Sequence, residues 1–218
     1  METWNPITGC MYNCVYCWAR NYAKRLAAME VEPYRTHGFK PVFAEWRLKQ
    51  KFPKGDFIFV SDMGEMWGNW VPKEWITKVL NVLTAKPKTN FLFLTKNPKR
   101  YSEFLGTFTD NMLLGATIET NRPNKLSGAP SYVERFEAMK NFDWKHKAVV
   151  VEPVLDFDPE FVDWIKEIKP ELVYVGYDNY NNKLPEPQLS KTRMLIDELQ
   201  KVGIHVEARN LRKAWFEA

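Results

Sequence analysis

The sequence predicts an α/β protein with a parallel sheet, because short apolar runs alternate along the chain with helix-length amphipathic segments. The runs themselves are continuously apolar, which is typical of strands covered on both faces. Six strand-then-helix units follow one another. Six are too few for a closed eight-stranded barrel, which leaves an open doubly wound sheet or a three-quarter barrel. No glycine-rich phosphate fingerprint follows the first strand, and this argues against a dinucleotide fold.

A short extended segment from Thr3 to Gly9 opens the chain, and an amphipathic helix from Trp18 to Met29 follows the cysteine-containing loop. Residues 31–56 lack periodicity and form a long connection with one irregular element, Val42 to Leu48. Further strands are predicted at Phe57–Val60, Phe91–Leu94, Leu113–Ile118, Ala148–Val151, Leu172–Val175 and Ile204–Val206. Further helices are predicted at Pro72–Leu83, from Pro98 onward, and at Ser131–Met139, Pro159–Ile168, Ser190–Val202 and Leu211–Trp215.

Length and composition limit the class of protein. The chain has 218 residues, 45% of them hydrophobic and 15% aromatic, which is enough for a sizeable core in a single domain spanning residues 1–218. There is no run of 18 apolar residues and no charged-then-apolar leader before Cys10, so we expect neither a membrane span nor a secretory signal. Unpaired thiols suit a reducing cytoplasm, where we expect the protein to be located. The net charge of +4 is a weak indication of an anionic partner.

All three cysteines lie in one run of eight residues, Cys10-Met11-Tyr12-Asn13-Cys14-Val15-Tyr16-Cys17. A structural zinc site usually has four protein ligands, and none of the three histidines, His37, His146 and His205, has a finger-like spacing. In an iron–sulfur cube the irons are held by thiolates, and three clustered cysteines leave one iron free for another ligand. The motif therefore favours an iron–sulfur cluster on Cys10, Cys14 and Cys17, with a zinc knuckle or unligated thiols as alternatives.

The cysteine spacing, with the aromatic Tyr16 before the last cysteine, resembles the radical S-adenosylmethionine (SAM) superfamily. The resemblance implies an open three-quarter (β/α)6 TIM-like barrel with the 4Fe-4S loop after strand one. It also implies that SAM binds the free iron and is cleaved reductively to a 5′-deoxyadenosyl radical, with an electron from a flavodoxin- or ferredoxin-type donor. Several runs are similar to an uncharacterised radical-SAM-like family of phages, bacteria and archaea that brings no established substrate: Trp4-Asn5-Pro6, Phe59–Met63, Leu94–Pro98, Gly115–Glu119 and Val151–Pro153.

Polar or charged residues follow every predicted strand, at the end of the sheet where parallel α/β proteins build their sites. SAM carries a carboxylate, an ammonium and ribose hydroxyls, so it requires such a mixed lining. By the resemblance, Tyr16 lies on the adenine side, and Asp62 or Glu65 binds the ammonium where the superfamily has Gly-Gly-Glu. Other candidates are Thr117, Glu119 and Asn121 for ribose, Lys96 or Arg135 for the carboxylate, and Ser61 and Glu152 in the same ring. For Arg135, a surface charge pair with Glu134 or Glu137 is the alternative role.

No cysteine remains for an auxiliary cluster or a thiol hydrogen donor, so a radical relay would need a tyrosine such as Tyr177 or Tyr180. Lys96 is the other catalytic candidate. We expect a nucleic acid or nucleotide as substrate, because the segments Trp67–Trp70 and Tyr177–Asn182 suit base stacking, unless they form a lid on the barrel rim. Basic residues support this expectation: Lys96, Lys99, Arg100, Arg209, Arg212 and Lys213. The alternative functions are a non-catalytic iron–sulfur or SAM-binding accessory or sensor protein, and a zinc-stabilised nucleic-acid-binding module.

Overall fold

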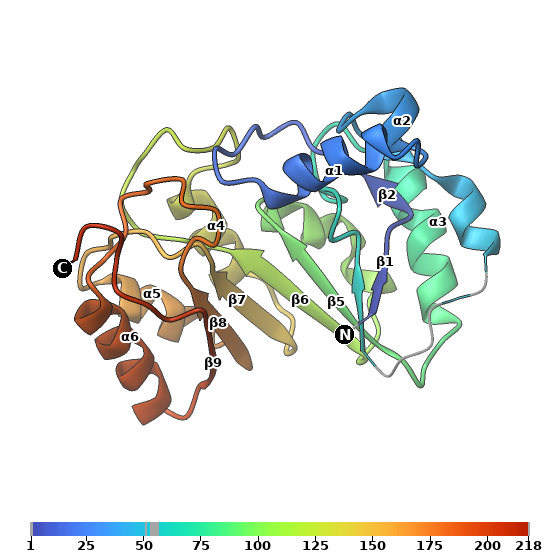
Figure 1. Cartoon of the computed structure of the whole chain (residues 1–218). Coiled ribbons are helices and arrows are strands. Elements are labelled where there is room, and N and C mark those ends of the chain that lie inside the picture. The colour runs from blue at the N-terminus through green and yellow to red at the C-terminus, as the bar shows by residue number, and fades with distance from the viewer. Residues whose placement is uncertain (1, 51, 53–56, 218) are drawn as a thin grey trace.

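A computed structural model describes residues 2–50, 52 and 57–217 of the chain. Its sheet is parallel and curled into a half-barrel, with strand order β1-β4-β5-β6-β7-β8-β9 (Figure 1). These strands are β1 (Glu2–Trp4), β4 (Phe57–Val60), β5 (Asn90–Thr95), β6 (Met112–Thr117), β7 (Lys147–Val151), β8 (Leu172–Gly176) and β9 (His205–Arg209). A separate antiparallel pair is formed by β2 (Ile7–Thr8) and β3 (Val42–Phe43). In the described residues β1 and β9 do not pair, so the half-barrel is open.

Helices connect the strands, and neighbouring helices pack against each other in chain order from η2 through α4 and α5 to α6. They are α1 (Trp18–Ala28), α2 (Tyr34–His37), α3 (Lys73–Thr84), α4 (Tyr132–Lys140), α5 (Phe161–Ile168), α6 (Leu189–Lys201) and the 3-10 helices η1 (Glu45–Lys49) and η2 (Pro98–Thr107). Figure 1 shows α1 lying across one end of the sheet, beside the loop that carries the cysteines. None of the helices in the described ranges is both long and apolar enough to cross a membrane.

Several segments differ from the sequence prediction. Leu211–Trp215 is not helical, because the Trp215 indole and backbone N–H groups bond to the 184–186 loop instead of to a preceding turn. The helix from Pro98 is a 3-10 helix. The predicted connection of residues 31–56 contains α2, β3 and η1 where one irregular element was expected, while its positions Pro53 to Gly55 lie outside the described residues.

The predicted opening strand is divided in two by Asn5 and Pro6. Pro6 has no N–H for a ladder, and the Asn5 side chain turns to the loop after β4. There its amide donates to Asp62 Oδ1 at 2.6 Å and its oxygen accepts from Met63 N–H at 2.8 Å. This division places the next residues, including the cysteines, over the end of the sheet.

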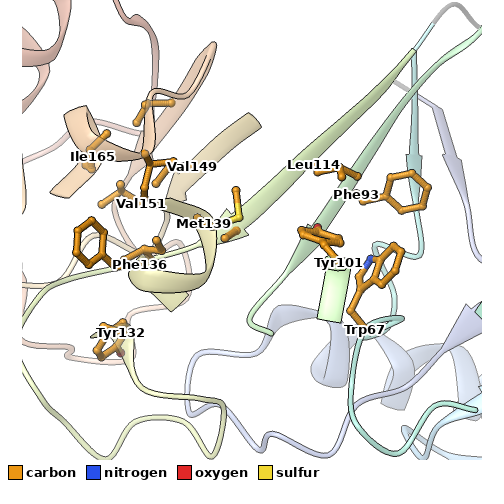
Figure 2. Packing of buried hydrophobic residues seen from close by; sticks show 14 of the residues in the cluster. Trp67, Phe93, Tyr101, Leu114, Tyr132, Phe136, Met139, Val149, Val151 and Ile165 are labelled. Carbon is orange, nitrogen blue, oxygen red and sulfur yellow. The ribbon is translucent and has the colours of Figure 1, made fainter. Parts of the chain in front are cut away.

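Successive side chains of the central strands point to opposite faces of the sheet. On one face, Phe93, Leu114 and Val149 are fully buried in the core, together with α4 residues such as Phe136 (Figure 2). On the other face, Phe59, Leu94 and Val150 form apolar walls of a cavity. The continuously apolar strands thus serve helices on one face and a cavity on the other.

Backbone hydrogen bonds fix the start of the cysteine loop. Gly9 N–H donates to Met63 O at 2.9 Å, and Glu65 N–H donates back to Gly9 O at 3.0 Å. Cys10 N–H donates to Phe39 O at 3.1 Å. The loop is therefore attached both to the turn after β4 and to the segment after α2.

Gly9 itself is needed for this approach, because its φ is +81° and a Cβ would lie 2.1 Å from the Lys40 carbonyl oxygen. We expect Gly9→Ala to lower the free energy of unfolding by more than about 2 kcal/mol, since the left-handed conformation alone costs an L-residue roughly 1–2 kcal/mol. Denaturant unfolding followed by circular dichroism measures this. Gly106→Ala is the matched control, because a Cβ there meets nothing within 4 Å. If Gly9→Ala and Gly106→Ala lowered the free energy of unfolding equally, the close approach at Gly9 would not be the cause.

Candidate functional site

A cavity of about 430 Å³ lies at the carboxyl ends of the strands, and all three cysteines line it. This volume is within the range of small-molecule sites, roughly 300–1,000 Å³. Most of the predicted cofactor contacts also line it: Tyr16, Ser61, Asp62, Glu65, Lys96, Thr117 and Glu152. Tyr177, Asn179 and Tyr180 lie on the same lining. The structure thus brings together residues from the cysteine loop and from the ends of five strands.

The far side of the cysteine loop is held by the loop before α4, which sequence reasoning did not assign to the site. Val15 N–H donates to Leu126 O at 2.9 Å, and Gly128 N–H donates to Tyr12 O at 2.7 Å. The two segments approach so closely that a Cβ on Gly128 would lie 3.1 Å from that same carbonyl oxygen. The cysteine loop is therefore clamped on both sides before any ligand binds.

Two of the sulfurs accept hydrogen bonds from backbone groups of their own loop. Cys10 Sγ accepts from Tyr12 N–H at 3.4 Å, and Cys17 Sγ accepts from Arg20 N–H at 3.4 Å as the N-cap of α1. Burial raises the pKa of both thiols, and the nearby Glu65 carboxylate raises the pKa of Cys10 further. A bound metal would lower these pKa values, because it stabilises the thiolate.

In the described part of the chain, no group of three or more His, Cys, Asp and Glu side chains could hold a single metal ion. A zinc ion requires its ligands around one point, at about 2.3 Å for sulfur. A four-iron cluster binds its thiolates at separate irons. The three cysteines line one cavity, as a cluster held at separate irons would require.

The most heavily buried charge beside the cavity is Glu119, whose side chain has no exposed surface. It accepts a short hydrogen bond from the Tyr16 hydroxyl and forms ion pairs with Lys96 Nζ at 2.9 Å and Arg135 Nη1 at 2.7 Å. Burial by itself raises the pKa of Glu119, but Lys96 and Arg135 outweigh this effect and the pKa lies below its usual value. The carboxylate is therefore charged, and it holds Tyr16 and Lys96 in place on the cavity wall.

Three of the predicted SAM contacts do not line the cavity. Both oxygens of Glu119 are occupied by protein partners. Arg135 is 2% exposed and donates to Pro130 O and Thr117 O besides Glu119, so it is neither a surface charge pair nor a group facing the cavity. The Asn121 amide oxygen accepts from Asp158 N–H at 2.8 Å, which ties two loops together away from the cavity.

The two acidic candidates after β4 differ in their partners. Glu65 accepts from Trp67 N–H at 3.1 Å, Thr95 Oγ1 at 2.6 Å and Lys96 N–H at 3.0 Å, so its oxygens fix the loop. Asp62 accepts one side-chain hydrogen bond, through Oδ1 from Asn5, and the backbone N–H groups of Asp62 and Met63 also lower the pKa of its carboxyl. Burial raises the pKa of both carboxyls, against the effect of these hydrogen bonds. Asp62 therefore has the greater capacity to bind a cationic ligand.

Ser61, which precedes Asp62, has a φ of +59°. This left-handed conformation is costly for a residue other than glycine, and such strain is concentrated at functional sites. Ser61 O accepts from Gly64 N–H at 3.0 Å in a tight turn. The turn directs the Asp62 carboxylate to the cavity lining instead of continuing β4.

The Tyr12 hydroxyl is buried and has no hydrogen-bond partner among the described residues, and Tyr12 lines the cavity. Buried polar groups are nearly always paired, because an unpaired one has lost its bonds to water. A group bound in the cavity could supply this partner. The free hydroxyl, the three sulfurs and the volume of the cavity together fit a cluster with a small ligand beside it.

The residues predicted for catalysis and for substrate binding differ in whether their side chains are available to a bound molecule. The Tyr177 hydroxyl bonds to Thr192 Oγ1 at 2.7 Å and Pro187 O at 3.0 Å, so its oxygen is committed to the region around the start of α6. Tyr180 is 56% exposed at the cavity. Trp67 has no exposed surface and packs on Tyr101 at a centroid distance of 4.7 Å (Figure 2), so it is not available for base stacking.

Several of the predicted phosphate-binding cations are already paired. Arg100 is buried and donates to Gly68 O and Val71 O. Arg212 forms an ion pair with buried Glu186 at 2.7 Å. Arg209 pairs with Glu207 at 3.4 Å and lies over the ring of Tyr174. Each of the three arginines therefore already has a partner within the protein.

A family model described as "Protein of unknown function (DUF5131)" matches residues 1–166. The chain belongs to this DUF5131 family. No curated protein matches it.

Several solved structures share the fold of this DUF5131 chain. Spore photoproduct lyase complexed with a dinucleoside spore photoproduct is similar with a TM-score of 0.57 and 12% identity, covering 91% of this chain and 61% of that one. A radical SAM methyltransferase from Sphaerobacter thermophilus has a TM-score of 0.56 and 14% identity, covering 95% and 65%. The DUF5131 chain therefore spans about three fifths of the length of these proteins, and it has the α/β half-barrel fold found in radical SAM enzymes.

The Glu119 network of the DUF5131 chain is open to a direct test. We expect Glu119→Gln to lower the free energy of unfolding at pH 7 by about 3–5 kcal/mol, the usual cost of removing one partner from a buried ion pair. Because the folded pKa of Glu119 is lowered, its charge stabilises the fold above the unfolded pKa of about 4.3. The difference in free energy of unfolding between the wild type and Glu119→Gln should therefore become smaller as pH falls through and below that value.

Denaturant unfolding at a series of pH values measures the effect. Glu160→Gln is the matched control, since that side chain is exposed at the start of α5 and has no hydrogen bond to the helix. A pH-independent deficit would show that the charge of Glu119 is not what stabilises the network.

Proposed function

We propose that this chain is a radical SAM enzyme, with a 4Fe-4S cluster on Cys10, Cys14 and Cys17 in a (β/α)6 three-quarter barrel. The observation that carries the proposal is the convergence of the only three cysteines with a mixed polar lining on one cavity at the carboxyl ends of parallel strands. The fold similarity to a lyase and to a radical SAM methyltransferase supports it. When bound, the reduced cluster supplies the electron that splits SAM into methionine and a 5′-deoxyadenosyl radical.

The side chains of the cavity have separate roles in this proposal. Asp62 binds the ammonium of SAM, because it lines the cavity and accepts one side-chain hydrogen bond, whereas the Glu65 carboxylate is held by three donors of its own loop and of β5. Lys96 binds the SAM carboxylate from the position that Glu119 gives it, and Tyr16 lies against the adenine. Ser61, Thr117 and Glu152 offer hydrogen bonds to the ribose. The apolar walls keep water away from the reaction.

The first test concerns the cluster and its chemistry. Anaerobic reconstitution should give roughly four irons and four sulfides per chain, and dithionite with SAM should then produce 5′-deoxyadenosine, measured by mass spectrometry. Cys14→Ala should abolish both, because the cluster loses one of its three ligands. Met11→Ala should change neither, since that side chain is 57% exposed on the same loop.

Two outcomes would favour the alternatives. A bound zinc without sulfide would indicate the zinc-stabilised nucleic-acid-binding module. A complete cluster that binds SAM but yields no 5′-deoxyadenosine on reduction would indicate an accessory or sensor protein.

The second test concerns Asp62. We expect Asp62→Asn to weaken SAM binding to the cluster-loaded protein by roughly ten- to hundredfold, since losing a charged hydrogen-bond partner costs about 1.5–3 kcal/mol. Calorimetry measures the affinity, and iron content verifies that the cluster is intact. Asp163→Asn is the control, because its side chain is 69% exposed on α5. Equal affinities in the Asp62 variant and the wild type would remove Asp62 from the site.

An external electron donor of the flavodoxin or ferredoxin type is the proposed partner. The outer surface of the cysteine loop and α1 exposes Met11, Val15, Trp18 and Tyr22. The charged residues of α1 are all basic, namely Arg20, Lys24 and Arg25. An acidic donor surface would be complementary to this helix, and it would reach the protein next to the cysteines.

A nucleic acid or nucleotide remains the proposed substrate class. Its support is Tyr180, exposed at the cavity beside Asn179, a pairing that suits stacking on a base and bonding to its edge. Spore photoproduct lyase, which shares the fold, is complexed with a dinucleoside. The internal pairs of Arg100, Arg209 and Arg212 remove part of the electrostatic support.

A further inference from the structure

We infer that Ser127 is a positioning residue for the cluster: its hydroxyl donates a hydrogen bond to the Cys14 thiolate and thereby raises the reduction potential of the cluster. The inference rests on the proposed function, because it concerns the 4Fe-4S group. It adds a residue outside the cysteine motif, more than a hundred positions along the chain from Cys14.

The geometry determines which atom donates. Ser127 Oγ lies 3.1 Å from Cys14 Sγ, and it also accepts a hydrogen bond from Ala129 N–H at 3.1 Å. Since this N–H can only donate, the hydroxyl hydrogen is left for another partner. A metal-bound thiolate has no hydrogen of its own, so in the loaded protein the bond runs from Ser127 to the sulfur.

Ser127 is held in this position by the residues on either side of it. Its chain neighbours Leu126 and Gly128 make the two backbone hydrogen bonds to the cysteine loop, at 2.9 and 2.7 Å. These bonds flank Cys14, because their partners are Val15 and Tyr12. The two backbone hydrogen bonds therefore fix the position of the Ser127 hydroxyl relative to the Cys14 sulfur.

The three sulfurs are not equivalent in this respect. Those of Cys10 and Cys17 accept from backbone N–H groups, which a side-chain substitution leaves in place. Among the described residues, Ser127 is the one side-chain hydrogen-bond partner of a cysteine sulfur. It is therefore the one such contact that a single substitution can delete.

The direction of the effect follows from the charge. Reduction adds an electron to the cluster and increases the negative charge on its thiolates. A hydrogen-bond donor stabilises the more negative form more strongly, since bonds to ionised groups are the stronger ones. Removing the donor should therefore make the reduction potential more negative.

The experiment is an anaerobic redox titration of the reconstituted 218-residue chain, followed by the electron paramagnetic resonance signal of the reduced cluster. We expect a more negative potential in Ser127→Ala and a potential near wild type in Ser127→Thr, which keeps the hydroxyl. Ser127→Val also removes the hydroxyl but has the same branched shape as threonine, so comparing the two variants isolates the effect of the hydroxyl. Ser131→Ala is the control, because it removes a hydroxyl from the same loop that caps α4 and has no contact with sulfur. Its potential should be unchanged.

The possible failures are distinguishable. A wild-type chain that takes up neither iron nor sulfide would refute the proposed function. A wild-type cluster whose potential is the same in Ser127→Ala, or the same in the Thr and Val variants, would overturn the inference alone. If both variants without the hydroxyl assemble no cluster while Ser131→Ala does, Ser127 is required for assembly and the tuning role is wrong.

Discussion

The buried carboxylate of Glu119 is the constraint on which the arrangement of the site depends. Burying an unpaired charge in that position would cost too much free energy for the fold to be stable. The carboxylate therefore requires partners, which are Lys96, Arg135 and Tyr16. These partners come from the end of β5, from α4 and from the cysteine loop. A buried ion pair adds little net stability compared with an apolar replacement. Removing one partner, however, strongly destabilises the fold, because the other charge is left buried and unpaired. In this protein the Glu119 network fixes the end of β5, α4 and the cysteine loop in one arrangement relative to each other.

That placement determines the shape of the cavity wall. Tyr16 and Lys96 line the cavity, while the carboxylate that orients them lies behind the lining. The cysteine loop is held at its start by the turn after β4 and at its far side by the loop before α4. The sulfurs are therefore positioned by protein contacts, and a cluster would bind to a loop that is already ordered. Such preorganisation reduces the entropy cost of binding.

The same network explains why several predicted contacts have a different role. Glu119 was assigned to SAM because it follows a predicted strand, and Arg135, within a predicted helix, was assigned from the family resemblance. The structure instead pairs them with each other. Sequence cannot distinguish a charge that faces a ligand from one that faces another buried charge, since both occur at the ends of strands. Arg100 and Arg212 illustrate the same point, because their partners lie in loops 26 to 32 residues away in the chain.

The sequence by itself determined the class of fold and the cysteine site. Continuous apolar runs specify a covered parallel sheet, and three cysteines in eight positions must lie together wherever the chain goes, since these signals are local. Tertiary structure alone decided which residues surround that site. Ser127, the free hydroxyl of Tyr12 and the bond between Asn5 and Asp62 depend on contacts between distant segments. Such contacts leave no periodic pattern in the sequence, because each is set by how loops meet above the sheet.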